Sequence, residues 1–533
     1  MNYFYRTLVV FLFAATPFFS VAQEDTNTPN EQTVHQHTPW CGTEYSDEQL
    51  KSLEEFVEYY YHRGGKEEMA ASARATIHVP LAYHLVSNSD GSGQIGLSKA
   101  MSDLCVLNQD MLATDIQFYL NHEIDMSVKN NAFNTGTSSG SSTPTQLSLM
   151  VPINNETDAV NVYQVTKIRD DNGIGGFAHG SVFHNNGAPV ANQSAVFIKK
   201  GSGGSGETFA HEFGHHFSLP HTFFGWEGQT NYACGSKAPA WAERYSGTNC
   251  ATSGDRMCDT DPDYIWDAWN CSGSSSLNNG CVQMDADSAT GFADGANIMS
   301  YAFQCSGRQF SDDQIAAMTF HLTNLRTNLI GTTPNTAPVT GVPTLISPIG
   351  NSFDGYDATT FEWASVPNAT HYAIEINRLA NFPDGILMVD MAVVANGTTY
   401  TSTNLDPNQT YHWRVLPFNE GYFCASPTPK KTFTSNGFTS NTNTITSVEK
   451  VDLMPNPVHS GQPANLVIKS DKAFEAGISI YDVSGRLILS EQREVSAGNT
   501  VHPISTTGLS AGIYIISVQS ANGVINKKLV ITE

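Results

Sequence analysis

The segment HEFGHHFSLPH, residues 211–221, constrains the fold of this 533-residue chain more tightly than any other stretch. His211 and His215 are four positions apart, so on an α-helix both side chains leave the same face and can bind one metal ion. His221 follows His211 by ten residues, and it reaches the same ion only if the helix ends soon after His215. The segment therefore predicts a helix and a sharp turn around one Zn²⁺, with these three histidines as ligands.

Glu212 directly follows the first histidine, where its carboxylate cannot easily become a further ligand. It can instead reach a zinc-bound water and act as its general base. His216 is on the wrong face of the helix to share the ion, so we expect a packed or surface side chain. Zinc peptidases of another type use a downstream glutamate as third ligand, but Glu227 and Glu243 lie in no matching context.

A second segment, ANIMSYAFQC at residues 296–305, provides two more side chains for such a site. We expect Met299 to form an apolar floor beneath the metal, as a methionine turn. Tyr301 can hydrogen-bond the oxyanion of a tetrahedral intermediate. The pattern M-x-Y is weak evidence alone, and its position after His221 is what makes it informative.

These motifs, with GDRMCDTDPD at residues 254–263, resemble those of the pappalysin family of metzincins (peptidase family M43) in their order along the chain and in their residues. The resemblance spans about residues 75–330. It implies an α+β catalytic domain with a twisted sheet and two long helices above an irregular, disulfide-tied lower subdomain. Ser218 departs from the metzincin pattern, which has a glycine there. A serine in the left-handed conformation costs roughly 1 kcal/mol, which is tolerable.

The same resemblance implies structural Ca²⁺ in the lower subdomain. Asp255 and Asp259, with Asp261 nearby, offer the oxygen ligands that calcium prefers. A polar loop capped by aspartates would explain the same residues without a metal. Asp255 and Asp259 are therefore candidate calcium ligands, and both explanations stay open at this stage.

Nine cysteines in an exported chain indicate disulfides. Cys105 lies on the apolar stripe of an expected helix, so we interpret it as a core thiol. Six others fall in one segment after the histidines and can form three bridges, whose pairing the sequence leaves open; they are Cys234, Cys250, Cys258, Cys271, Cys281 and Cys305.

Cys41 stands alone in the segment WCGT, ahead of an amphipathic helix. Proenzymes that resemble this chain carry a CGT segment at a similar place. A thiolate could occupy the open zinc position and displace the catalytic water, which would make Cys41 a latency switch. The alternative is that Cys41 pairs with another cysteine.

The N-terminal 22 residues have the layout of a secretory signal peptide: Arg6, an apolar run, and small residues ending at Ala22. Pro17 and Ser20 interrupt the run, which disfavours a membrane anchor. A net charge of −24 argues against nucleic acid or an anionic membrane as the partner. We expect an exported protein with no transmembrane segment in its mature form and a propeptide over residues 23–74.

Two all-β sandwich domains are predicted after the catalytic domain. A linker at residues 331–342 leads to residues 343–436, where strands alternate apolar and polar positions. This part resembles a fibronectin type III domain, with Tyr411 placed for a tyrosine corner and two tryptophans, Trp363 and Trp413, in the core. It would serve as a substrate- or glycan-binding module or as a spacer, and the spacer is favoured.

A second linker, residues 437–449, leads to residues 450–533. This segment closely resembles the C-terminal sorting domain of the type IX secretion system of Bacteroidetes, in the motifs PNP at 455–457, GIY at 512–514 and the Lys527-Lys528 tail. The resemblance implies passage through the periplasm and outer membrane to the exterior or cell surface, with the type IX machinery as partner. The alternative is a retained sandwich with a binding role.

The sequence thus predicts a secreted zinc-dependent endopeptidase that acts on proteins or peptides and is made as a latent precursor. The competing hypothesis is a surface-associated adhesive protein on a catalytically weak protease scaffold. The intact Glu212 argues against that hypothesis, because loss of this one side chain would be enough to abolish catalysis.

Overall fold

The computed structural model describes most of the chain from Cys41 onward. The predicted signal peptide (1–22), the start of the propeptide and most of the second linker lie outside the described residues. The described residues are 41, 47–71, 75–135, 154–168, 176–179, 183–185, 188–190, 195–201, 207–227, 232–266, 269–271, 281–303, 305–351, 356–383, 388–435, 445, 447–520 and 523–533. Within these ranges, no helix is long and apolar enough to cross a membrane.

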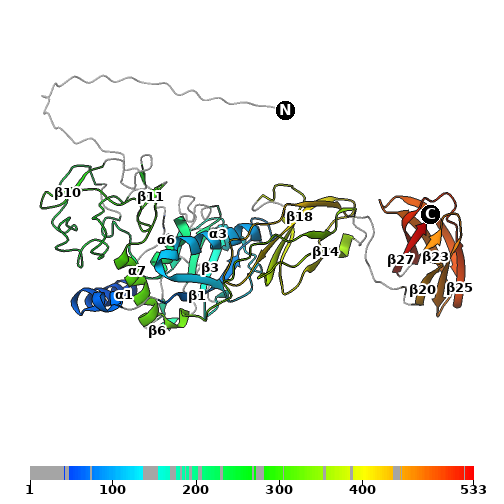
Figure 1. Ribbon diagram of the computed structural model, residues 1–533, viewed down its shortest axis with the longest axis horizontal. Helices are drawn as coiled ribbons and strands as arrows, with labels where there is room; N and C mark the ends of the chain where they lie inside the picture. Colours follow the sequence, from blue (N-terminus) through cyan, green and yellow to red (C-terminus); the bar gives the residue numbers. More distant parts are fainter. Residues whose placement is uncertain are drawn as a thin grey trace, which may run out of the picture. The chain divides into compact units, whose positions relative to one another are not determined.

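A five-stranded sheet forms the centre of the predicted catalytic domain (Figure 1). Its order is β2-β1-β3-β7-β4, in which the first four strands are parallel and β4 runs antiparallel to β7. Both faces are covered, which explains why β1 and β7 have nearly continuous apolar sequences. The strands are β1 (Ile77–Leu85), β2 (Ile116–Leu120), β3 (Val160–Val165), β4 (Gly176–His179) and β7 (Ala195–Lys199).

Two helices, α3 (Leu97–Asp110) and α6 (Glu207–His216), share one core with one face of this sheet. Phe213 of α6 lies in that core, whereas Tyr163 and Phe197 belong to a second core that includes residues of the other face. Because α6 buries its apolar side against the sheet, its remaining side is free to carry polar site residues.

The last long helix of this domain is α7 (Asp312–Phe320), which continues as the π-helical turn η4 (His321–Leu325). A capping box starts α7: the Ser311 side chain accepts from the Gln314 backbone, and the Gln314 side chain accepts from the Ser311 backbone.

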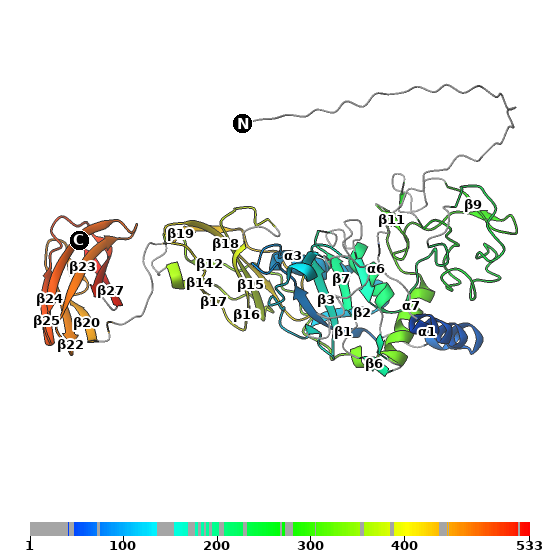
Figure 2. The same cartoon turned by 180° about the vertical axis from the view of Figure 1, so that it is seen from behind.

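The helix in the predicted propeptide is α1 (Asp47–Val57), and η1 (Glu58–His62) and α2 (Gly65–Ala71) follow it. It lies beside α7 (Figure 2). Phe56 and Tyr60 are buried in the same core as α6 and the sheet. This segment is therefore packed into the catalytic domain along much of its length.

Three disulfides tie the lower subdomain together: Cys234–Cys281, Cys250–Cys258 and Cys271–Cys305. The six cysteines expected to form three bridges do so, and the pairing that the sequence left open is now defined. The remaining short elements are η2 (Leu112–Thr114), α4 (Asn131–Thr135), β5 (Phe183–Asn185), β6 (Ala188–Val190), β8 (Trp269–Asn270), β9 (Gln283–Met284), β10 (Thr290–Gly291), β11 (Ala302–Phe303) and η5 (Thr327–Leu329).

The next segment is mostly β and forms two sheets, of order β12-β14-β17 and β13-β19-β18-β15-β16. Trp363 and Trp413 are buried between them, and the Asp406 backbone donates a 2.7 Å hydrogen bond to the Tyr411 hydroxyl, as a tyrosine corner requires. The elements are β12 (Leu345–Ser347), β13 (Gly350–Asn351), η6 (Tyr356–Ala358), β14 (Thr359–Trp363), β15 (His371–Asn377), β16 (Met388–Ala395), β17 (Thr399–Ser402), β18 (Thr410–Phe418) and β19 (Lys431–Thr434).

The prediction that Cys105 is a core thiol is wrong. Cys105 of α3 forms a disulfide with Cys424, 319 positions away in the β segment. The buried Glu375 of β15 strengthens the same junction, because its carboxylate accepts from both the backbone and the hydroxyl of Ser98 in the first turn of α3. An acid at a helix N-terminus is favourable for the helix dipole. The β segment is therefore bound directly to a helix of the catalytic core.

The C-terminal segment forms two further sheets around its own core, of order β20-β22-β25 and β21-β27-β26-β23-β24. Ile478, Ile516 and Leu529 lie at the centre of that core. The strands are β20 (Val448–Met454), β21 (Val458–His459), β22 (Ala464–Ser470), β23 (Phe474–Asp482), β24 (Leu487–Val495), β25 (Gly498–Ile504), β26 (Gly512–Ser520) and β27 (Gly523–Thr532).

Candidate metal centre

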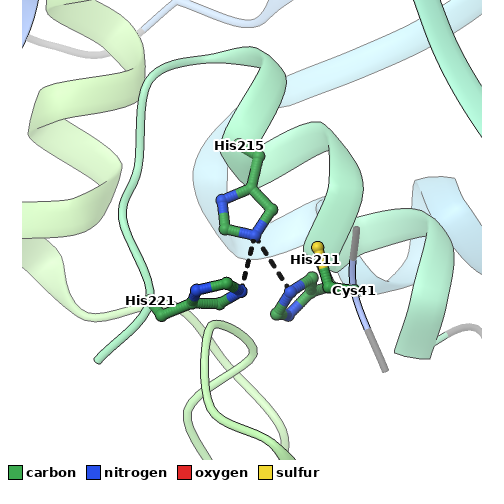
Figure 3. A group of neighbouring side chains, drawn as sticks. All are labelled: Cys41, His211, His215 and His221. Carbon is green, nitrogen blue, oxygen red and sulfur yellow. Dashed lines mark hydrogen bonds between the residues drawn. The ribbon is translucent and has the colours of Figure 1, made fainter. Parts of the chain in front are cut away.

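Three histidine side chains converge where α6 ends (Figure 3). The Nε2 atom of His215 lies 3.1 Å from Nε2 of His211 and 3.0 Å from Nε2 of His221. Ligand nitrogens around a tetrahedral zinc, with bonds of about 2.0 Å, are separated by roughly 3.3 Å, so this arrangement is close to a metal-binding one. All three side chains are buried.

The outer nitrogens show which tautomer is present. Nδ1 of His211 lies 2.8 Å from the Ile298 carbonyl, and Nδ1 of His215 lies 2.7 Å from the Leu219 carbonyl. A carbonyl only accepts, so each Nδ1 carries the proton and each Nε2 presents a lone pair inward. Burial lowers the pKa of both histidines well below its usual value, which keeps them neutral. Buried neutral imidazoles with converging lone pairs fit a divalent cation.

Ser218 makes the turn that brings His221 back. Its φ of +73° is the left-handed conformation that the metzincin glycine would adopt. The Ser218 hydroxyl lies 2.9 Å from Nδ1 of the buried His321, and this hydrogen bond offsets part of the backbone strain. The chain thus reaches the expected turn with a residue other than glycine.

Met299 is fully buried beneath α6. A Cβ atom on Gly214 would lie 2.4 Å from the Met299 sulfur, so the helix needs a glycine at this position to rest on the methionine. Sequence reasoning missed Gly214, although a glycine inside a helical pattern is itself a signal of close packing.

Glu212 and Tyr301 both contact Cys41, whose thiol lies beside the three histidines. The Cys41 thiol donates to the Glu212 carboxylate at 3.5 Å. The Cys41 backbone N–H donates to the Tyr301 hydroxyl at 3.3 Å, and that hydroxyl lies 3.2 Å from the Cys41 carbonyl. Burial raises the pKa of Tyr301 well above its usual value, so the hydroxyl stays a neutral donor.

Cys41 is a buried free cysteine, so the alternative in which it forms a disulfide is wrong. Its Sγ and one nitrogen from each of the three histidines all lie within 4.8 Å of one another. Its backbone also pairs with Gly176, the first residue of β4. A Cβ on Gly176 would lie 2.4 Å from Cγ of Glu212, so this edge of the sheet has room for the acid only because it carries a glycine.

The two candidate calcium ligands accept hydrogen bonds from different parts of the chain. Asp255 is buried and accepts hydrogen bonds from the Met257 backbone and the Thr260 hydroxyl, whereas Asp259 accepts from Ser311 and the Asp313 backbone at the start of α7. Among the described residues, neither belongs to a group of three ligand atoms within metal-binding distance. Calcium at Asp255 and Asp259 stays a prediction.

Two contacts of the site could not be predicted. The Gln49 side chain of α1 donates to the His215 carbonyl at 3.3 Å. The Glu227 carboxylate, considered above only as a zinc ligand, lies 3.2 Å from Nδ1 of His221. His216 is buried and packs against Phe217, as its position on the helix indicated.

Two family models match this chain. The reprolysin-like metallopeptidase family M12B matches residues 104–222, which include the three histidines. The secretion system C-terminal sorting domain matches residues 452–532. No curated protein matches the chain.

Solved structures similar to this chain include the FN1–FN3 domains of chicken CNTN1, at 11% identity over 37% of this chain and 69% of that one, with a TM-score of 0.17. Dimeric latent PorU from Porphyromonas gingivalis is similar at 14% identity, over 38% of this chain and 20% of that one, with a TM-score of 0.14. An FN3tt mutant is similar at 21% identity, over 18% of this chain and 98% of that one, with a TM-score of 0.14.

The chain therefore contains a reprolysin-like metallopeptidase domain, followed by mostly β domains, and it ends in a type IX sorting domain. The peptidase domain implies a catalytic metal and protein substrates. The sorting domain supports export across the outer membrane to the exterior or the cell surface, through the type IX machinery.

Proposed function

We propose that the chain is a secreted zinc endopeptidase of pappalysin type, made as a latent precursor in which Cys41 blocks the site. The observation that carries the proposal is the convergence of three inward Nε2 atoms beside Cys41, which in turn contacts an acid and a tyrosine. His211, His215 and His221 would hold the metal.

The residues around the cluster have the chemistry for peptide hydrolysis. Zn²⁺ in this site would polarise the scissile carbonyl and lower the pKa of its water. Glu212 would accept a proton from the attacking water and pass it to the leaving amine. Tyr301, a neutral donor, would hydrogen-bond the developing oxyanion.

The contacts of Cys41 support the proposed latency. Its thiolate would serve as a fourth metal ligand beside the three histidines and take the place of the attacking water. The same residue contacts Glu212 through its side chain and Tyr301 through its backbone. One residue would therefore block the metal, the base and the oxyanion donor together.

The proposal is tested on the exported protein after its N-terminal segment has been removed. We expect one zinc per chain by atomic spectroscopy, together with hydrolysis of denatured casein that a chelator abolishes and added zinc restores. A protein that binds zinc in equal amount but hydrolyses nothing would favour the adhesive alternative. A protein without stoichiometric zinc would contradict the proposal.

A further inference from the structure

The three zinc-facing histidines differ in what holds their outer nitrogens. His211 and His215 are both on α6, and their Nδ1 atoms contact backbone carbonyls. His221 follows the helix in a turn, and its Nδ1 contacts the Glu227 carboxylate at 3.2 Å. The Nδ1 partner of His221 is thus a carboxylate side chain, whereas the Nδ1 partners of His211 and His215 are backbone carbonyls.

Glu227 is held in place by its own turn. Its second carboxylate oxygen accepts from the Gly225 backbone at 2.7 Å, and Gly225 has a φ of +93°. Between them, Trp226 is buried in an aromatic cluster with Trp241 and Tyr264. Both oxygens of Glu227 therefore have defined partners, and the buried tryptophan anchors the turn that presents them.

We propose that Glu227 is a positioning residue for the third zinc ligand, an inference that rests on the proposed zinc site. Its carboxylate would fix the His221 ring so that Nε2 faces the metal, and it would increase the electron density of that imidazole. Glu227 is not itself a ligand, because it lies on the outer nitrogen of His221. The requirement is greatest at His221, whose backbone has no helix to fix it.

The test compares Glu227→Ala and Glu227→Gln in the full-length chain, with zinc affinity measured by competition against a chromophoric chelator. Loss of such a partner typically weakens metal binding about 10–100-fold, and we expect this for Glu227→Ala. Glutamine keeps an acceptor for Nδ1, so Glu227→Gln should retain most of the affinity. The Glu227 side chain is 36% exposed, so neither change leaves a buried void.

Asp287→Asn is the matched control, because it removes an exposed carboxylate of the same subdomain that pairs with Arg244. Cobalt-substituted protein gives a second readout, since a displaced His221 ring should change the visible absorption of Co²⁺ in Glu227→Ala and leave it unchanged in Asp287→Asn. Equal zinc affinity in wild type and Glu227→Ala would overturn the inference. Wild-type protein that binds no zinc would instead contradict the proposed function.

Discussion

The thiol of Cys41 donates a hydrogen bond to the carboxylate of Glu212, 171 positions further along the chain. The backbone of the same cysteine contacts the Tyr301 hydroxyl. A short piece of the N-terminal segment thus lies against the proposed base and the proposed oxyanion donor at once. Under the proposed latency, displacement of this one residue is what frees the site.

Replacement of Cys41 tests the latency directly. We expect the Cys41→Ala precursor to hydrolyse denatured casein, or to cleave itself, before its N-terminal segment is removed. Cys41→Ser is a stricter variant, because it keeps the size of the side chain but loses the thiolate that zinc prefers. In wild-type precursor, Co²⁺ should show a thiolate charge-transfer absorption that both variants lack. If the Cys41→Ala precursor hydrolysed no more casein than the wild-type precursor, the latency would have to come from the α1 segment covering the site sterically.

The N-terminal helices should contribute to the stability of the precursor through Asp313. This buried carboxylate of α7 accepts from the Tyr60 and Tyr61 hydroxyls and pairs with Lys66. Asp313→Asn removes the charge that these partners face, so we expect a loss of about 1–3 kcal/mol in the free energy of unfolding, measured by denaturant titration.

The adjacent Asp312 provides the control for that experiment, because its side chain is exposed at the start of the same helix. Asp312→Asn should change the stability by no more than about 0.5 kcal/mol. Equal losses in the two variants would show that the effect comes from the helix terminus and not from contacts with the N-terminal segment.

The Cys105–Cys424 disulfide predicts how the chain behaves after a cut between domains. A specific protease site placed within residues 331–342 would separate the catalytic domain from the β segment along the chain. We expect the two fragments to stay together on a non-reducing denaturing gel and to separate when reduced. In a Cys105→Ser variant they should separate under both conditions. Separation of the wild-type fragments without reductant would contradict the bridge.

The calcium hypothesis has a pH signature. Burial raises the pKa of both candidate ligands, Asp255 and Asp259, above the ordinary value of 3.8, because a buried carboxyl group is more stable in its neutral form. The native state then binds more protons than the unfolded state, so stability should fall as pH rises above about 4. Calcium would reverse this by binding the charged carboxylates. We expect added Ca²⁺ to raise the melting temperature more at pH 8 than at pH 5, and an equal or absent effect would reject the hypothesis.

Local patterns predicted much of the candidate site. The spacing of His211 and His215 defines a helical face, and the resemblance to the metzincin pattern implies the left-handed turn found at Ser218. The first inference depends on neighbours within one turn, where helix geometry alone is decisive.

Contacts between distant parts of the chain could not be predicted. An apolar stripe shows that the face of Cys105 is covered, but not that the covering element carries Cys424, 319 positions away. The hydrogen bond between Ser98 and Glu375 was equally unpredictable, because no residue near either one in the sequence indicates its partner. The contact of Glu227 with His221 could not be predicted either, because an acid in a turn has no periodic pattern that indicates its partner.

The most direct test of the account is Glu212→Ala, measured on mature protein for zinc content and for casein hydrolysis in parallel. This change removes the proposed base and leaves the three histidines intact, so we predict one zinc per chain and a loss of hydrolysis of about 10²-fold or more. A Glu212→Ala protein that keeps its zinc and hydrolyses casein at more than a few per cent of the wild-type rate would contradict the mechanism.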